Sequence, residues 1–256
     1  MPRYFLEVSY KGTLYSGFQT QHNANTIQAE IEKAINTLLR LSEKESISLT
    51  GSSRTDAGVH ALQNYFHFDS IIPVEDWVGI KNRSQFLYKM NAILPADIVV
   101  KHLLPVGKEA HCRFDAISRQ YCYYIYHHKD PFLKEKAYYF PYKLDIEAMQ
   151  AAASLIKRYT DFTSFSKRNT QVKSFICQVI ESQWEITNEG LIYQVKANRF
   201  LRGMVRALTA TMLKVGRQTI SLDDFKAIIE ERDCTGASFA VPPHGLFLMN
   251  VQYPDN

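Results

Sequence analysis

The sequence contains few cysteines, and neither they nor the histidines have the spacing of a metal site. The four cysteines, Cys112, Cys122, Cys177 and Cys234, are far apart and form no Cys-x-x-Cys pair. We therefore expect reduced thiols that act as small core residues, as in a reducing compartment. The eight histidines include no His-Glu-x-x-His motif, so no zinc site is predicted.

Long hydrophobic runs are also missing. No stretch is apolar over a length that crosses a bilayer, and the first seven residues show no signal-peptide pattern. No low-complexity segment is present. These absences predict a soluble, cytoplasmic protein with no membrane contact.

Size and charge are compatible with many functions. The chain has 256 residues, 46% of them hydrophobic, which is enough for one large domain or two of ordinary size. Its formal net charge is +4. A small positive excess is compatible with RNA binding, although many soluble proteins carry one on a solvated surface.

The hydrophobic pattern alternates between strands and helices. In the first half it predicts strands at 4–10, 47–50, 64–69 and 98–104, one helix opened by Asn25 and another at 74–90. In the second half it predicts strands at 118–127, 176–186 and 191–197, and helices at 145–159, at 202–215 and after Ser221. Hairpins mixed with helices are typical of an α+β fold.

The two halves resemble ferredoxin-like (RRM-like) units. The first half has the β-α-β-β-α-β order of that unit. A short polar break at 105–108 predicts an N-terminal α+β domain of residues 1–106 and a C-terminal α+β domain of residues 107–256.

A polar loop, Gly51-Ser52-Ser53-Arg54-Thr55-Asp56-Ala57-Gly58, lies between two of the predicted strands. Small residues around Asp56 leave room for a ligand to approach the main chain. A tight turn whose aspartate accepts its own backbone N–H groups would have a similar sequence. The loop by itself leaves both interpretations open.

The other motifs favour a loop that binds a ligand over a simple tight turn. The loop resembles the signature loop of the tRNA pseudouridine synthase A (TruA) family, in which the aspartate is catalytic. Further segments are similar to motifs of that family and follow in its order: Tyr10–Gln21, His111–Ala116, Arg119–Tyr123, Asp161–Phe165, Ala197–Arg206 and Val241–Leu248.

The resemblance implies an enzyme that isomerises uridine to pseudouridine in the anticodon arm of tRNA. It assigns Asp56 as the essential carboxylate, Tyr121 as the ring against the flipped base, and Arg206 as the basic partner of Asp56. It also implies a homodimer and two sheets joined into one extended, mainly antiparallel sheet, with helices on one side and a central active-site cleft.

Physical chemistry explains why such a site combines these residue types. A carboxylate taken out of water beside a neutral base requires a compensating positive charge, which a helix holds rigidly. Without the motif, Arg206 would be read as part of a solvated basic face, as Arg202 is, and Tyr121 as a core aromatic residue.

Other residues are expected to bind the substrate. Five basic side chains would hold RNA phosphates: Arg54, Lys167, Arg168, Arg199 and Arg202. Arg54 has a second possible role, which is to brace the loop. Leu246 and Phe247 either line the base pocket or pack in the core.

The reaction breaks the bond between ribose C1′ and uracil N1 and joins C1′ to C5, without redox change. No cofactor and no metal are therefore expected. Asp56 acts as a nucleophile at C1′ or C6, or assists a glycal-forming elimination, and these routes stay open. The base must leave the RNA stack, because a side chain cannot reach C1′ and C5 within a helix.

Two other functions fit part of the pattern. A non-catalytic RNA-binding protein built on paired ferredoxin-like domains would not need Asp56, Tyr121 and Arg206 together. A hydrolytic N-glycosylase would use Asp56 with water, release uracil and leave an abasic ribose.

Overall fold

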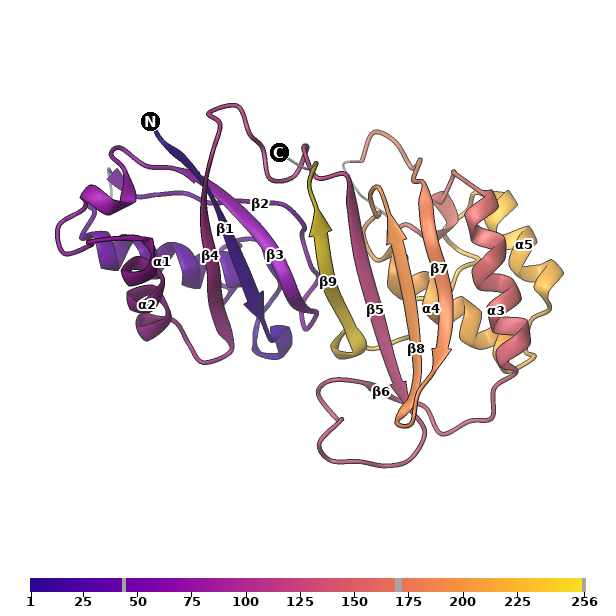
Figure 1. The fold of residues 1–256 in the computed structure, drawn as a ribbon. Helices are drawn as coiled ribbons and strands as arrows, with labels where there is room; N and C mark the ends of the chain where they lie inside the picture. The colour runs from indigo at the N-terminus through magenta and orange to yellow at the C-terminus, as the bar shows by residue number, and fades with distance from the viewer. Residues whose placement is uncertain (43–44, 169–171, 255–256) are drawn as a thin grey trace. The chain divides into compact units, whose positions relative to one another are not determined.

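The computed structural model describes residues 1–42, 45–168 and 172–254 and divides into two compact units (Figure 1). Unit 1 comprises Met1–Ile117 and Leu248–Asn256, and unit 2 comprises Ser118–Phe247. Each unit combines helices with a mainly antiparallel sheet, so the predicted α+β class is confirmed. The polar break at 105–108 begins at the end of a strand of unit 1.

The sheet of unit 1 is antiparallel, in the strand order β4-β1-β3. Its strands are β1 (Arg3–Tyr10), β3 (His60–Asp69) and β4 (Ile98–Val106), and the short β2 (Thr50–Gly51) pairs with β3. Alternate residues of a strand share one face of the sheet, and one face of this sheet carries a large apolar cluster. The buried residues of this face include Tyr4, Leu6, Val8, Phe66 and Phe68.

Two helices complete unit 1, and they contact each other (Figure 1). Helix α1 (Ile27–Leu39) begins after Thr26, whose hydroxyl accepts a hydrogen bond from Ala29 N at 3.3 Å. The predicted start at Asn25 was therefore one residue early. A threonine cap satisfies one of the backbone N–H groups that have no partner within the helix.

Helix α2 (Arg83–Ile93) is shorter than the predicted helix at 74–90. A 3-10 turn occupies Val74–Asp76. The α-helix starts only after Asn82, whose side chain accepts from Gln85 N at 2.9 Å. The prediction was wrong here because an apolar periodicity continued across this internal cap.

The sheet of unit 2 has the strand order β5-β8-β7. Its strands are β5 (Ser118–Tyr126), β7 (Val179–Ile186) and β8 (Gly190–Ala197), and β6 (Tyr138–Tyr139) pairs parallel to β5. The predicted hairpin between β7 and β8 is confirmed. Three helices pack against one another in this unit, namely α3 (Ile146–Leu155), α4 (Met204–Gly216) and α5 (Leu222–Glu231) (Figure 1).

Helix α4 is buried on nearly every side. Thr209 and Thr211, on this buried helix, donate their hydroxyl protons to the carbonyls of Val205 and Ala207, at 2.8 and 2.7 Å. Backbone carbonyls thus satisfy polar atoms that burial would otherwise leave without partners. The helix is the central element of the core of unit 2.

The last strand, β9 (Leu246–Gln252), was not predicted. Its first two residues belong to unit 2 and the remainder to unit 1. In unit 1, Val251 N donates to Gln63 Oε1 at 3.1 Å, and the hydroxyl of Tyr253 donates to Cys112 O at 2.6 Å. The end of the chain therefore completes the unit with which the chain begins.

All four cysteines are free thiols. Cys112, Cys122 and Cys177 are buried, as predicted for core residues, whereas Cys234 is only half-buried. Burial raises the pKa of Cys122 and of Cys177 to about 11, so neither forms a thiolate readily near neutral pH. None of the helices in the described part of the chain is long and apolar enough to cross a membrane.

We expect Gly190→Ala to destabilise the protein by at least about 2 kcal/mol. Gly190 begins β8 with a φ of +156°, and an added Cβ would lie 2.1 Å from the carbonyl oxygen of Ile125. Urea unfolding followed by circular dichroism measures the change. Gly107→Ala is the control, because nothing lies within 4 Å of its added Cβ; equal stability losses in the two variants would contradict the prediction.

Candidate active site

The Asp56 loop enters β3 through a set of backbone hydrogen bonds. Ser52 N donates to Tyr65 O at 2.8 Å, and Phe18 N donates to Thr55 O at 3.1 Å. Val59 N then donates to Asp56 O at 3.2 Å and closes a turn. The main chain on both sides of the Asp56 carboxylate is therefore fixed to unit 1.

Side chains alternate along this loop. Ser53 and Thr55 are buried, whereas Arg54 is exposed and Asp56 is half-buried. Among the described residues, the guanidinium of Arg54 makes no hydrogen bond or ion pair. The loop thus carries the Arg54 guanidinium and the Asp56 carboxylate on its more exposed side. Ser53 and Thr55, which alternate with them, lie on its buried side.

A buried tyrosine and a buried asparagine of the sheet hold the loop by hydrogen bonds. The hydroxyl of Tyr10 lies 2.8 Å from Thr55 Oγ1, and Asn64 Nδ2 donates to Ser53 O at 2.9 Å. Neither Tyr10 nor Asn64 was predicted to be a site residue. Both residues lie in strands that mix polar and apolar side chains, so no local pattern marked them.

An aromatic stack fixes the start of the loop. The rings of Phe18 and Phe66 stack with centroids 4.5 Å apart. A Cβ at Gly51 would lie 2.0 Å from Phe18 Cε1. Only a glycine at this position therefore lets the stack form beside the loop.

Tyr121 lies on β5 of unit 2, paired with Val195 of β8. It is buried, and its ring packs edge-on against Phe200, with centroids 5.1 Å apart. An edge-to-face contact of this kind holds a ring in one orientation.

Arg206 lies in the first turn of α4. Its Nε and Nη2 atoms both donate to the carbonyl oxygen of Val241, at 3.0 and 2.6 Å. The predicted start of this helix at residue 202 was two residues early, because α4 begins at Met204 after Gly203, whose φ is +77°. Arg202 is exposed and precedes the helix.

The closing motif is fixed by the same part of unit 2. The hydroxyl of Tyr123 donates to Pro242 O at 2.7 Å, and burial raises the pKa of this hydroxyl far above its ordinary value. Leu246 is buried, while Phe247 packs edge-on against Tyr124 with centroids 5.1 Å apart. Two tyrosines and Arg206 therefore position the segment that leads into β9.

The predicted phosphate-binding residues of unit 2 are distributed unevenly. Lys167 N donates to Arg202 O at 2.9 Å, so these two residues are neighbours. Arg168 is exposed, and its Nε donates to Cys234 Sγ at 3.3 Å. Arg199 is half-buried just after β8. Among the described residues, the hydrogen bonds place only Lys167 and Arg202 side by side.

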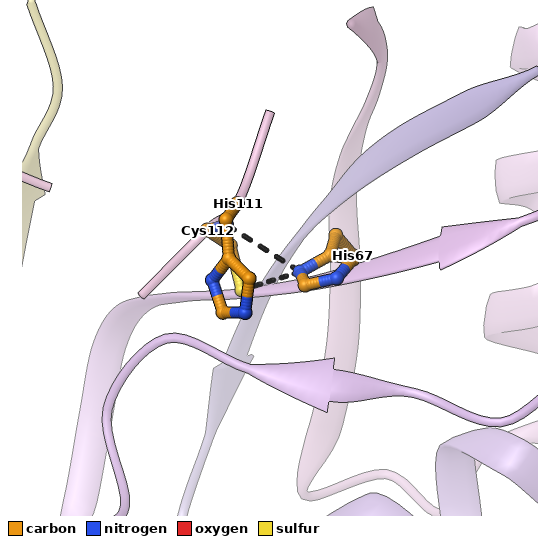
Figure 2. Close-up of side chains that lie close together, drawn as sticks. All are labelled: His67, His111 and Cys112. Carbon is orange, nitrogen blue, oxygen red and sulfur yellow. Dashed lines mark hydrogen bonds between the residues drawn. The ribbon is translucent and has the colours of Figure 1, made fainter. Parts of the chain in front are cut away.

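The side chains of His67, His111 and Cys112 form a cluster (Figure 2). Its possible ligand atoms lie within 4.8 Å of one another. The spacing of cysteines and histidines along the chain does not predict this group, because its members come from β3 and from the loop after β4. These distances are short enough for the three side chains to share one metal ion, if their lone pairs are available.

Hydrogen bonds to the two rings argue against a metal ion. Cys112 N donates to Nδ1 of His67 at 3.4 Å, and Arg113 N donates to Nδ1 of His111 at 3.1 Å. A neutral imidazole that accepts at Nδ1 carries its proton on Nε2, so neither ring keeps a lone pair for an ion. The cluster fits a role in packing, which joins β3 to the loop after β4.

Comparison with known proteins shows the family to which the chain belongs. A family profile described as tRNA pseudouridine synthase matches residues 7–115 and 159–254. The chain belongs to this family. Asp56 and Arg206 lie within the matched segments of the pseudouridine synthase profile, and Tyr121 lies between them.

Full-length relatives agree with the family match. A protein named tRNA pseudouridine synthase A from Parabacteroides distasonis is 42% identical over 255 residues, which are 100% of this chain and 97% of the relative. Proteins of the same name from Bacillus subtilis and Staphylococcus aureus are 37% and 34% identical. These alignments cover 96% and 99% of this chain and 97% and 92% of the relatives.

We expect His67 to make the protein sensitive to acid. Burial, followed by the charges of His111 and Arg3, lowers the pKa of His67 from 6.5 to about 4. Between these values the unfolded chain binds a proton that the folded chain does not, so stability falls as the pH falls through this window. The loss from about pH 7.5 to about pH 5 is about 2 kcal/mol.

The His67→Asn variant removes the titration and keeps an acceptor for Cys112 N. Urea unfolding at the two pH values should therefore show a pH-dependent loss about 2 kcal/mol smaller than in the wild type. The exposed His22 provides the control, His22→Asn. An unchanged pH dependence in His67→Asn would show that His67 protonates normally in the folded protein.

Proposed function

We propose that this chain converts uridine to pseudouridine in tRNA. Its membership of the tRNA pseudouridine synthase family carries the proposal. In this reaction the C1′–N1 bond breaks and a C1′–C5 bond forms, while C5 loses a proton and N1 gains one. Product and substrate have the same composition, so the atoms balance without an oxidant, reductant or cofactor.

Asp56 is the essential carboxylate in this proposal. Support comes from the loop, which fixes its main chain on both sides of Asp56 and leaves the side chain half-buried. A carboxylate held in one place can act at C1′ or C6 of a bound uridine, or can direct a proton during elimination. Holding the freed uracil beside the sugar is worth roughly 7 to 11 kcal/mol when the geometry is ideal.

Arg206 and Tyr121 supply the other two parts of the proposed site. The bonds from Arg206 to Val241 O fix the guanidinium, which is the property required of an ion-pair partner for Asp56. The edge-on contact with Phe200 fixes the ring of Tyr121, which then lies against the flipped uracil. The buried Leu246 lines the pocket beside it or packs below it.

Basic residues hold the RNA backbone in this proposal. Arg54 is exposed and makes no hydrogen bond to its own loop among the described residues. This favours a contact with RNA over the alternative of bracing the loop. Lys167, Arg168, Arg199 and Arg202 hold further phosphates, so tRNA affinity falls as salt rises.

At the level of the fold, we propose two ferredoxin-like halves, residues 1–106 and 107–256, and a central active-site cleft. The strand order β4-β1-β3, with β2 beside β3, supports this for the first half. The proposal also includes a homodimer, a substrate uridine in the anticodon arm and a cytoplasmic location.

One assay distinguishes the proposed reaction from its alternatives. The protein is incubated, without metals or nucleotides, with unmodified tRNA that carries tritium at uracil C5. Tritium release together with a new nucleoside of unchanged mass supports the isomerase. Free uracil and an abasic site indicate a hydrolytic N-glycosylase, and tRNA binding without either product indicates a binding protein.

Asp56→Asn should lower the rate of tritium release at least about 100-fold, because a neutral amide is neither a nucleophile nor a base. Affinity for tRNA, measured by filter binding, should stay near that of the wild type. Asp76→Asn is the control, because Asp76 is an exposed carboxylate in the same unit. Wild-type turnover by Asp56→Asn would remove Asp56 from the mechanism.

Arg206→Gln should lower the single-turnover rate about 10- to 100-fold and move the acid limb of its pH profile to higher pH. The reason is that the proposed partner charge, which favours the ionised carboxylate, is gone. Single-turnover rates between about pH 5 and 9 test this, with the exposed Arg158→Gln as control. A lower rate with an unshifted acid limb would show that Arg206 is not paired with the catalytic acid.

A further inference from the structure

A buried chain of hydrogen bonds links the two central strands of unit 1 to the Asp56 loop. Asn64 Nδ2, on β3, donates to the Tyr10 hydroxyl of β1 at 3.1 Å and to Ser53 O at 2.9 Å. The same Tyr10 hydroxyl lies 2.8 Å from Thr55 Oγ1. Tyr10 and Asn64 are buried, at 4% and 0% exposure.

Backbone groups, which can act only as a donor or only as an acceptor, determine which way the Asn64 amide is turned. Tyr65 N, which can only donate, reaches Asn64 Oδ1 at 2.9 Å, and Ser53 O, which can only accept, lies 2.9 Å from Asn64 Nδ2. Asn64 must therefore turn its NH₂ group toward Tyr10 and Ser53. Because the oxygen of Tyr10 accepts from Asn64, its own proton is suited to Thr55 Oγ1.

These bonds act on the residues next to Asp56. Ser53 and Thr55 are anchored, and they alternate with Arg54 and Asp56 on the outer side of the loop. Thr55 is held twice, through its hydroxyl by Tyr10 and through its carbonyl by Phe18 N. The residue immediately before Asp56 therefore has little freedom.

We propose that Tyr10, Thr55 and Asn64 are positioning residues that set the direction of the Asp56 carboxylate. The inference rests on the proposed role of Asp56. It predicts that loss of the Tyr10–Thr55 bond lowers the rate of the chemical step and leaves tRNA affinity unchanged. A shift of about 1 Å in a reacting group costs up to about 100-fold in rate.

Tyr10→Phe and Thr55→Val each remove one oxygen atom from this bond with little change of shape. We expect each to lower the single-turnover rate of tritium release about 10- to 100-fold, with an unchanged Kd for tRNA. Thr55→Ser keeps the hydroxyl and should restore most of the rate. The double variant should be no slower than the slower single variant, because both changes remove the same bond.

Tyr65→Phe is the matched control. Tyr65 is a buried tyrosine of the same sheet, and its hydroxyl donates to Glu7 Oε2 at 2.8 Å on the face opposite Asn64. The control loses a comparable buried hydrogen bond that does not touch the loop. Its single-turnover rate should stay at the wild-type value even where urea unfolding shows lower stability.

The outcomes separate this inference from the proposed function. Wild-type rates for Thr55→Val, or an equal rate loss in Tyr65→Phe, would overturn the positioning role; should Tyr10→Phe not fold, Thr55→Val decides alone. Asp56→Asn is measured in the same assay. If it is active, the role of Asp56 fails; if it is inactive while Tyr10→Phe and Thr55→Val keep full rate, only the positioning role fails.

Discussion

Pairing between β1 and β3 is the contact on which the candidate site depends. Val8 pairs with Asn64, but Tyr10 pairs with Ala61, so β3 accommodates one extra residue at this point. Such a bulge bends a strand and redirects its side chains. Here it accompanies the 3.1 Å contact between the Tyr10 hydroxyl and the Asn64 amide, although the two residues are not directly opposite each other.

The rest of the loop geometry follows from that contact. Tyr10 and Asn64 belong to the sheet, so their hydroxyl and amide groups are as fixed as the sheet itself. Groups built on strands are held more accurately than groups built on loops. The loop that carries Asp56 is thus tied to two strands of the sheet through Ser53 and Thr55.

Much of the fold could be predicted from the sequence, because its strands and several helices have a clear period. Strands β1, β4 and β5, the β7-β8 hairpin and α4 lie close to their predicted positions. The failures have local causes. The helix predicted at 74–90 starts late because Asn82 caps it, and β9 lacks strict alternation, its buried residues being Leu246, Leu248 and Val251.

The site was predictable in part. The position of Asp56 between strands follows from the pattern of the chain, whereas its supports do not. Tyr10, Thr55 and Asn64 lie up to 54 positions apart in the chain, and their contact depends on the register of β1 and β3. Register is decided by the packing of the whole sheet, which no local pattern contains.

The return of the last strand to unit 1 has a consequence for synthesis on the ribosome. Unit 1 begins to emerge first, yet Val251 and Tyr253, which bond to Gln63 and Cys112, emerge after all of unit 2. Domains generally fold in the order in which they are translated. In this protein the half that is translated first is completed last.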